Sequence, residues 1–465
     1  MEDIISSMPK DILFIVVSLL PFKEAAKTSI LSRKWRLIWL ATTNIEFDER
    51  HFVKQDEESE ENKENQRRDL IRFARRWIRS YEEPIIHKFC LAFSYPANHA
   101  LDMQHCIRFA VARGVKVLDL DFSVPSWNEM SLEDHHAAFF DLPFYVYTYP
   151  AENLESLKLF SCNFLVARFK IFRALKNLSL GWANLTTSVV TALLTKCPVL
   201  ESLSLKRCWG LDYLDISAPS LTSLVVDKCL DLKRGIRVDA RTLRFLKYSG
   251  RVISLRIEYL RSIVEAVLDF GLEFEFSDHG ELLCDFCVEV GCSRVLTICS
   301  YMLQVIPTAE DRLSIEPPLD VEHLTLKTAL DAKEYYGITF FLSSCPYLKT
   351  LSIDLTAPSR IFEEYSIDLP LDCHDFVMSK PYVVYPCVSS TLKVVEVKGF
   401  KGGENELGAL RYFIRHGSVL EKMAISVSKE EGPAGVFSLV LQYRQKAMQL
   451  LQFRRASLSL AIVIS

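Results

Sequence analysis

Apolar and polar positions follow two different periods along the chain, and each period predicts a different kind of element. Near the start, apolar residues recur at helical spacing over residues 12–20, and Pro21 ends the run. A second short helix is expected over residues 23–29, and Ser32 is a good cap for a third, which carries Trp35. Three such helices are too small to be secure alone, so a partner or a neighbouring domain should cover part of their apolar surface.

Beyond residue 110 the pattern changes to L-x-x-L-x-L, with some leucines replaced by other apolar residues. The closing L-x-L is a short strand with two inward side chains, and the first leucine enters the same core from the preceding turn. Successive copies begin at a spacing within the range of about 20 to 29 residues that is typical of leucine-rich repeats. The clearest copies are Leu154/Leu157/Leu159, Leu175/Leu178/Leu180, Leu200/Leu203/Leu205, Leu221/Leu224/Val226 and Leu243/Leu246. Weaker copies are Val115/Leu118/Leu120, Ile263/Ala266/Leu268, Val321/Leu324/Leu326 and Leu348/Leu351/Ile353.

One such repeat cannot fold alone. Burying a leucine is worth about 1.5 to 3 kcal/mol, whereas ordering each residue costs about 1 to 2 kcal/mol of backbone entropy, so neighbouring repeats must stack into a curved array. The side chains between the leucines then line its concave face. They mix small, charged and apolar types, which suits a protein or peptide better than a phosphate polymer. The candidate target-binding residues are Lys158, Phe160, Ser179, Ser204, Lys206, Val225 and Asp227. The alternative for any one of them is a merely solvated strand surface.

Cysteines support the same architecture. Three repeats extend to L-x-x-L-x-L-x-x-C through Cys162, Cys208 and Cys229, where leucine-rich repeats place an inward Asn or Cys. The 13 cysteines are odd in number and scattered through apolar segments. This predicts buried, reduced thiols with a structural role and no disulfide framework.

The last part of the chain follows a strand, helix, strand pattern. A strand is expected over residues 391–397 and a glycine-containing turn over 398–405. A helix should follow over 406–416, with Gly417 as its stop, before another strand near residues 423–427.

Composition and charge exclude some classes of protein. The chain has 465 residues, of which 49% are hydrophobic and 25% charged, and its net charge is -4. It lacks the basic excess expected of a dedicated nucleic-acid binder. The acidic start is unlike a secretory signal, and the first apolar stretch is too short to span a bilayer. We therefore expect a soluble protein of the cytoplasm or the nucleus, without a nucleic-acid or membrane partner.

The region after the three helices is strongly charged. An acidic run over residues 48–64 predicts a solvated, flexible loop. The following segment, residues 67–79, alternates arginines with apolar residues and predicts an amphipathic helix with a basic face. Nucleic-acid binding is the alternative for that face, but a solvated helix face beside an acidic segment is the favoured interpretation.

The helical start resembles a plant F-box. The residues that carry the resemblance are Met8-Pro9-Lys10-Asp11-Ile12-Leu13, Leu19-Leu20-Pro21, the segment from Thr28 to Arg36, and Trp39. In that family the motif binds the Skp-type adaptor of an SCF (Skp, cullin, F-box) ubiquitin ligase. The resemblance implies adaptor binding by Met8, Pro9, Ile12, Leu13, Leu20, Pro21, Leu31 and Trp35. Met8 stands where the family usually has leucine, and this exchange conserves volume.

The end of the chain resembles the FBD domain of plant F-box proteins, through the segment Cys387 to Leu392, Gly399-Phe400, Glu404 to Leu407 and Arg455-Ala456-Ser457. The predicted fold class is α/β: a short N-terminal three-helix F-box, a leucine-rich-repeat solenoid and a C-terminal α+β FBD region. The predicted segments are an F-box over 1–47, an acidic linker and bridging helix over 48–110, leucine-rich repeats over 111–375 and an FBD domain over 376–465.

No pattern predicts catalysis, a metal or a cofactor. The pair Cys284/Cys287 with Cys292 lacks a fourth zinc ligand and predicts buried apolar cysteines. Residues 133–136 (Glu-Asp-His-His) predict a polar loop, because adjacent positions do not all converge on one ion without a special loop fold. Residues 399–403 contain three glycines but lack the spacing of a phosphate-binding loop, and predict a turn.

The leading hypothesis is a non-catalytic substrate-recognition subunit of an SCF-type ligase. The F-box would bind the Skp-type adaptor and through it a cullin, and the repeats would bind an unidentified target protein. One alternative is a repeat scaffold that assembles no ligase, and another is a receptor for a small molecule on the concave face. Co-purification with an adaptor separates the first two hypotheses.

Overall fold

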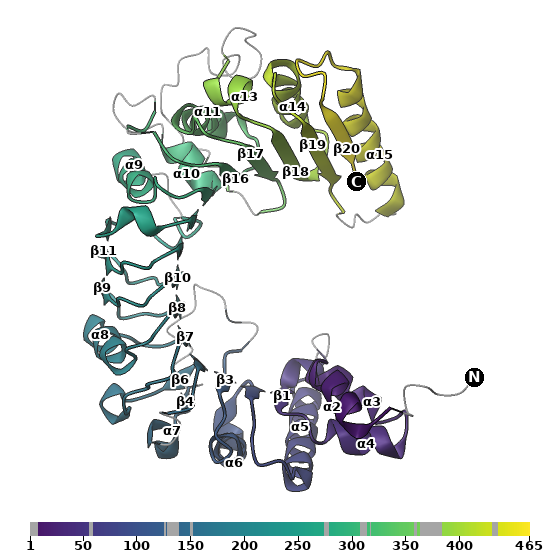
Figure 1. The fold of residues 1–465 in the computed structure, drawn as a ribbon, viewed down its shortest axis with the longest axis vertical. Helices are drawn as coiled ribbons and strands as arrows, with labels where there is room; N and C mark the ends of the chain where they lie inside the picture. The colour runs from purple at the N-terminus through teal and green to yellow at the C-terminus, as the bar shows by residue number, and fades with distance from the viewer. Residues whose placement is uncertain are drawn as a thin grey trace. The chain divides into compact units, whose positions relative to one another are not determined.

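The computed structural model describes residues 8–54, 59–124, 127, 139–148, 152–273, 279–306, 314–316, 318–357, 360–362, 384–429 and 436–465. The chain divides into two compact units, Met1–Leu211 and Asp212–Ser465. Both units combine helices with parallel strands (Figure 1). In each unit strands occupy the L-x-x-L-x-L positions, so the predicted leucine-rich-repeat architecture is confirmed.

The three predicted helices at the start of the chain are present. They are α2 (Lys10–Ser18), α3 (Phe22–Thr28) and α4 (Arg33–Trp39). Pro9 and Pro21 stand at the N-caps of α2 and α3, where a backbone N–H would have no partner within the helix. The Ser32 hydroxyl caps α4 by accepting a hydrogen bond from the Trp35 N–H at 3.4 Å.

Parallel strands form the main sheet of the first unit. They are β1 (Asn44–Asp48), β2 (Lys88–Ala92), β3 (Val117–Asp121), β5 (Ser156–Phe160), β7 (Asn177–Gly181) and β8 (Ser202–Lys206). Leu157 of β5 lies in register between Leu118 of β3 and Leu178 of β7, and all three are buried. A short separate ladder pairs β4 (Phe140–Asp141) with β6 (Cys162–Asn163). The repeat leucines therefore form one continuous core beneath the sheet.

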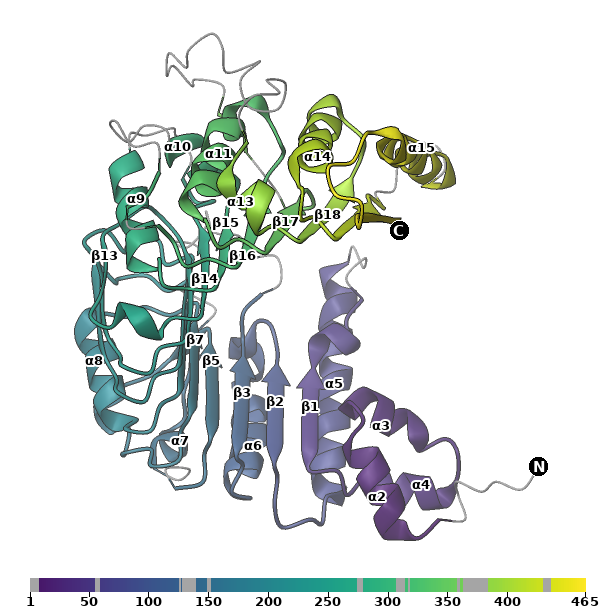
Figure 2. The ribbon, with the colours of Figure 1, turned by 45° about the horizontal axis from the view of Figure 1, so that its top comes forward.

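Helices cover one face of this sheet (Figure 2). Trp77 of α5 (Glu60–Ser80) packs against Phe47 of β1, with 5.9 Å between ring centroids. Phe109 of α6 (Ala100–Val111) packs against Phe89 of β2 at 6.5 Å. The remaining helical segments of this unit are η1 (Glu49–His51), η2 (Pro96–His99), α7 (Phe144–Thr148), η4 (Val166–Arg168) and α8 (Thr187–Lys196). The opposite face of the sheet carries the half-exposed side chains of each strand.

The acidic run after the three N-terminal helices differs from its prediction where the structure describes it, and residues 55–58 of the run lie outside the described residues. Asp48 ends β1, Glu49 begins η1 and Glu60 begins α5, so these residues are not part of a solvated loop. Glu49 is buried because its carboxylate accepts a hydrogen bond from the Ser94 N–H at 2.7 Å and lies 3.6 Å from Arg67 Nε. β1, which Asp48 ends, pairs with β2, and these two strands begin the parallel sheet.

The second unit repeats the plan. Its main sheet consists of β10 (Ser223–Asp227), β12 (Phe245–Ser249), β14 (Glu265–Asp269), β15 (Val295–Ile298), β16 (His323–Lys327), β17 (Thr350–Asp354), β18 (Val394–Phe400), β19 (Lys422–Val427) and β20 (Ala461–Ile464). Before β10, and again between β10 and β12 and between β12 and β14, the chain forms strands of a second, three-stranded parallel sheet. These strands are β9 (Tyr213–Ser217), β11 (Gly235–Asp239) and β13 (Leu255–Ile257). This second sheet was not predicted from the sequence.

Later connections of the second unit contain helices. They are η5 (Leu260–Ser262), α9 (Gly280–Glu289), α10 (Ser300–Val305), η7 (Ala332–Glu334), α11 (Tyr335–Ser344), α13 (Pro386–Ser390), α14 (Glu404–His416), α15 (Val436–Met448) and η8 (Gln449–Gln452). The predicted strand, helix and strand near the end are confirmed as β18, α14 and β19. The turn between β18 and α14 is closed by the chain itself, because the N–H groups of Lys401 and Gly402 donate to the Glu406 carboxylate at 2.8 and 3.0 Å.

A left-handed residue follows several strands and turns the chain off the sheet. These residues are Ser161 (φ 56°), Trp182 (φ 47°), Arg207 (φ 51°) and Lys228 (φ 57°). In three of these turns the next residue is a buried cysteine: Cys162, Cys208 or Cys229. The Cys208 thiol, for example, lies 3.6 Å from the Lys206 carbonyl oxygen. The predicted structural role of these thiols is confirmed.

The cysteines in the described part of the chain are thiols outside any disulfide, and all of these except Cys292 are buried. Burial raises the pKa of the Cys90 and Cys197 thiols to about 12. These two thiols are therefore protonated side chains of the apolar core.

Candidate protein-docking surfaces

An aromatic cluster holds the three-helix module against the sheet of the first unit. Phe22 of α3 lies edge-on to Trp39 of α4 at 5.7 Å and to Phe47 of β1 at 5.8 Å. Trp39 also contacts Trp77 of α5, with 6.1 Å between ring centroids. Aromatic pairs of this kind are worth roughly 0.5 to 1.5 kcal/mol beyond the area that they bury. The module and the sheet therefore share one packed core, with the helices beside β1 (Figure 2).

Helix α2 is apolar on two faces. Its inner face buries Leu13 and Val17 completely. Its outer face is exposed and places apolar residues at i, i+3, i+4 and i+7, the spacing of a single helical face. The residues of this outer face are Ile12, Ile15, Val16 and Leu19. Leu19 is 80% exposed, so no described part of the chain covers this face.

Two further apolar residues are exposed between α3 and α4. Ile30 is 84% exposed and Leu31 is 64% exposed. Helices with apolar residues all round are normally buried, and exposed apolar patches mark interaction sites. The module therefore presents the kind of surface that a partner protein covers.

The eight predicted adaptor-binding residues fall into two groups. Met8, Pro9, Ile12, Pro21 and Leu31 are exposed, and Leu20 is half-buried. Leu13 and Trp35, in contrast, are buried inside the module, at 0% and 4% exposure. Their side chains support the module's surface and do not form it. Adaptor binding by these residues stays a prediction.

The sequence analysis missed four exposed residues of the module, namely Ile15, Val16, Leu19 and Ile30. The signal for three of them was present, because they continue the i, i+3, i+4, i+7 row that starts at Ile12. Periodicity did not separate that row from a second apolar row, Leu13 and Val17, which runs along the same helix.

The half-exposed strand face of the first unit is the second candidate surface. Alternation places Lys158 and Phe160 of β5 on this face, as predicted. Lys158 Nζ lies 3.2 Å from Asp119 Oδ1 and 2.9 Å from Asp121 Oδ2, both on the neighbouring β3. Its ammonium also lies 4.5 Å from the centroid of the Phe160 ring. Lys158 is therefore held by its neighbours and is only partly available to a ligand.

The electrostatics of this cluster follow from its partial burial. Burial raises the pKa of the Asp119 carboxyl even though Lys158 lies beside it. Burial also acts to lower the pKa of Lys158, but the attraction of Asp121 and Asp119 outweighs this, and the pKa is raised. Lys158 is therefore protonated across the physiological range.

The other candidate target-binding residues lie on the same kind of face. Ser179, Ser204 and Lys206 follow Lys158 and Phe160 across β7 and β8 and are half-buried. The Phe160 ring covers Gly181 of β7, where a Cβ atom would approach it to 2.7 Å. In the second unit, Val225 and Asp227 of β10 are half-buried, and Asp227 lies 3.3 Å from Lys247 Nζ. Target binding by these residues stays a prediction.

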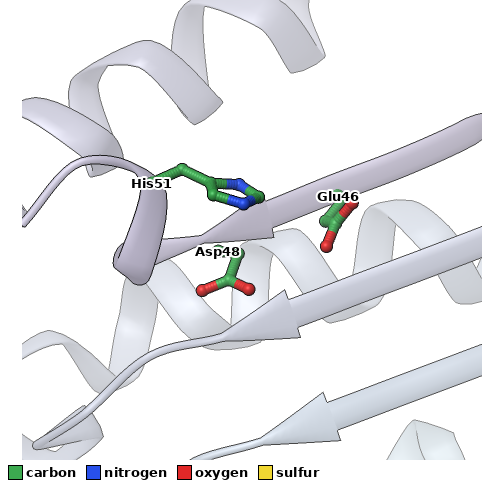
Figure 3. Close-up of side chains that lie close together, drawn as sticks. All are labelled: Glu46, Asp48 and His51. Atoms are coloured by element: carbon green, nitrogen blue, oxygen red, sulfur yellow. The ribbon is translucent and has the colours of Figure 1, made fainter. Parts of the chain in front are cut away.

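Metal binding finds little support among the described residues. Cys284 and Cys287 are both buried in α9, and Cys292 is half-buried. One described group of three ligand types, Glu46, Asp48 and His51, has its ligand atoms within 4.8 Å of one another (Figure 3). The predicted polar loop over residues 133–136 lies outside the described residues.

Arg50 already occupies the Asp48 carboxylate of that group. Its Nε lies 2.9 Å from both Asp48 oxygens, and its backbone N–H donates to Oδ1 at 2.9 Å. A cation would have to displace this guanidinium, so we infer no metal site there.

Taken over the described residues, no helix is both long enough and apolar enough to cross a membrane.

An exposed apolar helical module followed by leucine-rich repeats defines a class of modular binding proteins. Comparison with known proteins gives the same organisation. The F-box domain family matches residues 5–42, the leucine-rich repeats of FBD-associated F-box protein At5g56370 match residues 103–262, and the FBD family matches residues 381–425. These matches describe no enzyme, and the boundaries of the four predicted segments stay predictions.

Proteins from Arabidopsis thaliana are similar to this chain over most of its length. Putative F-box/LRR-repeat protein At5g54820 is 32% identical, over 97% of this chain and 98% of the relative. Putative F-box/LRR-repeat protein At1g56400 is 32% identical, over 91% and 90%. Putative F-box/FBD/LRR-repeat protein At1g66290 is 27% identical, over 91% and 87%. The chain belongs to the plant F-box/FBD/leucine-rich-repeat protein family, as its sequence motifs predicted.

Proposed function

We propose that this protein is a substrate-recognition subunit of an SCF-type ubiquitin ligase. An F-box domain implies binding to a Skp-type adaptor and, through it, a cullin. The observation that carries the proposal is the exposed outer face of α2, with Leu19 80% exposed, in a chain whose F-box family is shown. The protein itself would be non-catalytic, because other subunits of such a ligase transfer ubiquitin. The same proposal places it in the cytoplasm or the nucleus.

Burial of these exposed residues would contribute favourably to docking. Full burial of one such side chain is worth about 1.5 to 3 kcal/mol. A few well-packed residues carry most of the binding energy of a typical protein interface, and Ile12, Ile15 and Leu19 are adjacent on one helical face. An adaptor that covers the outer face of α2 would bury this apolar surface, which the described part of the chain leaves exposed to water.

The strand face would hold the target. In the first unit the aromatic cluster packs the F-box against the sheet that carries Lys158 and Phe160. A target bound to that face would therefore keep a fixed position relative to the adaptor. Such positioning raises the effective concentration of target lysines near the conjugating enzyme, and it accelerates transfer without any catalytic residue of this chain.

Co-expression with a Skp-type adaptor tests the proposal. The full chain should co-purify with the adaptor, and an Ile15→Glu/Leu19→Glu double variant should lose it. Leu101→Glu is a matched control, since Leu101 is 79% exposed on α6 of the same unit. Trp35 is unsuitable for this test because it is buried, so its replacement would perturb folding. Equal adaptor retention by both glutamate variants and the wild type would refute the docking surface.

Target capture needs a separate measurement. A true target should bind the wild type and the Ile15→Glu/Leu19→Glu variant equally, because the substitutions lie outside the strand face. It should become ubiquitinated only with the wild type, in a reaction reconstituted with adaptor, cullin and conjugating enzyme. Equal ubiquitination with the variant would show that transfer does not depend on the F-box.

A further inference from the structure

The residue just before each strand forms a row along the edge of the sheet where the strands begin. After the first residue of the row in each unit, each member donates its backbone N–H to the carbonyl of the preceding member at 2.8 to 2.9 Å, so the side chains lie next to each other. We call this row the edge ladder. In the first unit it comprises Lys116, Glu155, Lys176 and Glu201. In the second unit it comprises Thr222, Arg244, Val264, Arg294, Glu322, Lys349, Lys393 and Glu421.

Most charges of the edge ladder are neutralised by a neighbour on the next strand. The pairs and their N–O distances are Lys116–Glu155 (2.9 Å), Lys176–Glu201 (3.0 Å), Glu322–Lys349 (2.9 Å) and Lys393–Glu421 (2.9 Å). A lysine and a glutamate on adjacent strands meet in each case. The ladder therefore carries little net charge where these pairs occur.

The pairing breaks at β12, β14 and β15. Arg244 and Arg294 precede β12 and β15, and the uncharged Val264 stands between them. Neighbouring strands are roughly 4.8 Å apart, so the backbones of the two arginines lie roughly 10 Å from each other, with the apolar Val264 in the gap between them. Arg261 of η5 lies beside the same gap. Within the described residues none of the three arginines makes an ion pair.

These arginines line a cavity of about 970 Å³ in the second unit. Its apolar lining includes Ile263 and Val264, and Tyr347 is exposed beside them. Lys349 also lines it, as do two anionic side chains, Asp320 and Glu322.

The charge of the lining is positive overall. Four cationic side chains face two anionic ones. Glu322 is already bonded to Lys349 at 2.9 Å, and Arg294 acts on it only by longer-range attraction. Among the described residues of the lining, Asp320 is therefore the one acidic side chain left to offset three guanidinium groups.

We propose that this cavity binds a phosphorylated serine or threonine in an extended segment of the target protein. The inference deepens the proposed function, because it rests on this chain recognising a target. Guanidinium groups bind phosphate oxygens through paired hydrogen bonds, and a phosphate carries about -1.5 to -2 charges at pH 7. One such group matches the excess charge of the cavity, and Ile263, Val264 and Tyr347 offer contacts for the residues beside it.

The arrangement favours a single phosphate over a phosphate polymer. A nucleic acid needs a continuous track of cations along its backbone. Here the neighbouring lysines of the edge ladder are already neutralised, because Lys349 pairs with Glu322 and Lys393 pairs with Glu421. An unphosphorylated acidic peptide presents one negative charge per carboxylate, and it satisfies three arginines less well than one phosphate.

Binding of a peptide library to the full chain tests the inference. The probe is a degenerate nine-residue library with a fixed central phosphoserine, compared with the same library carrying serine or glutamate there. We expect selective retention of the phosphorylated library and competition by millimolar inorganic phosphate. In an Arg244→Gln/Arg294→Gln variant, the affinity of the selected peptides should fall about tenfold for each arginine removed.

The control variant is Lys116→Gln/Lys176→Gln, which removes two positive charges from the edge ladder of the first unit. All four substituted side chains are exposed, so thermal denaturation should match the wild type. Unchanged peptide affinity in the control, with loss in the arginine variant, supports the proposal. Equal loss in both variants, no preference for phosphoserine over serine, or equal retention of the glutamate library overturns it.

Adaptor binding measured on the same samples separates this inference from the proposed function. The Arg244→Gln/Arg294→Gln variant should keep the Skp-type adaptor and lose the phosphopeptide. The Ile15→Glu/Leu19→Glu variant should do the reverse. A chain that binds phosphopeptide but no adaptor would overturn the ligase role and leave the phosphate site standing.

Discussion

The ring of Phe22 in α3 lies edge-on to the indole of Trp77 in α5, with 5.6 Å between ring centroids and 78° between the ring planes. This contact joins the F-box to the first long helix of the repeat region. Both side chains are buried, so the F-box core and the core of the first repeats are continuous. The F-box should therefore unfold together with those repeats.

Replacement of Trp77 tests this continuity. Trp77 is 3% exposed, and Trp77→Ala should lower the free energy of unfolding of the first unit by about 3 to 5 kcal/mol. Thermal denaturation and limited proteolysis of the full chain measure the effect. Arg76→Ala, at the exposed neighbouring position, is the control and should behave like the wild type. Wild-type denaturation of Trp77→Ala would contradict a shared core.

Alanine substitutions of Ile12 and Leu13 should have different effects, the first on adaptor binding and the second on stability. Leu13 is fully buried, so Leu13→Ala should cost about 2 to 5 kcal/mol of stability. Ile12 is exposed, so Ile12→Ala should change stability by less than about 0.5 kcal/mol while weakening adaptor binding. Denaturant midpoints and adaptor titrations on both variants provide the comparison. The two substitutions are adjacent in sequence, and identical effects would contradict the assigned faces of α2.

Ser161→Gly should stabilise the protein. Ser161 has a φ of 56°, and its buried hydroxyl has no hydrogen-bond partner among the described residues. Glycine accepts this conformation and removes the unsatisfied group, which should raise stability by about 1 kcal/mol. Ser161→Ala removes only the hydroxyl and should gain less. The melting temperatures of the two variants test this, and a lower value for Ser161→Gly than for Ser161→Ala would be evidence against strain at this turn.

Asp48 should make stability dependent on pH. Burial acts to raise the pKa of its carboxyl, but hydrogen bonds from Arg50 outweigh burial and hold the pKa below its ordinary value of 3.8. A carboxyl with a lower pKa in the folded state stabilises the protein above its unfolded pKa, and it loses this contribution as the pH falls through the folded pKa.

The difference in unfolding free energy between wild type and Asp48→Asn should therefore be constant from about pH 5 to 7 and shrink below the ordinary pKa of the carboxyl. Denaturant titrations across this range measure it. In an Arg50→Ala background the pH dependence should largely disappear. A difference that grows on acidification would reverse the assigned sign.

The sequence was most informative where one side of an element is buried. Leu157 and Leu159 alternate with half-exposed residues, and this period of two predicted β5 and its equivalents correctly. The second sheet was missed although Leu211, Leu214 and Ile216 have the same spacing at β9. That copy falls between the regular repeats that begin at Leu200 and Leu221.

Tertiary packing decided what the sequence left open. Both faces of α2 are apolar, so periodicity alone does not tell which face the core covers. The answer depends on where α3, α4 and β1 lie. Likewise, the acidic residues near Glu49 suggested a loop, but Ser94 and Arg67 supply partners from distant positions and allow its burial. A charged run predicts solvent exposure only where no such partners exist.

The buried cysteine thiols can serve as intrinsic probes of local unfolding. Alkylating reagents attack the thiolate, which is scarce while burial keeps the pKa of residues such as Cys106 and Cys387 near 12. A buried sulfur reacts only after local unfolding exposes it, so the labelling rate of each cysteine measures how often that part of the chain opens. These cysteines are spread from Cys90 to Cys387. Mass spectrometry of partly labelled protein would therefore report the frequency of local unfolding at each of them, without any introduced probe.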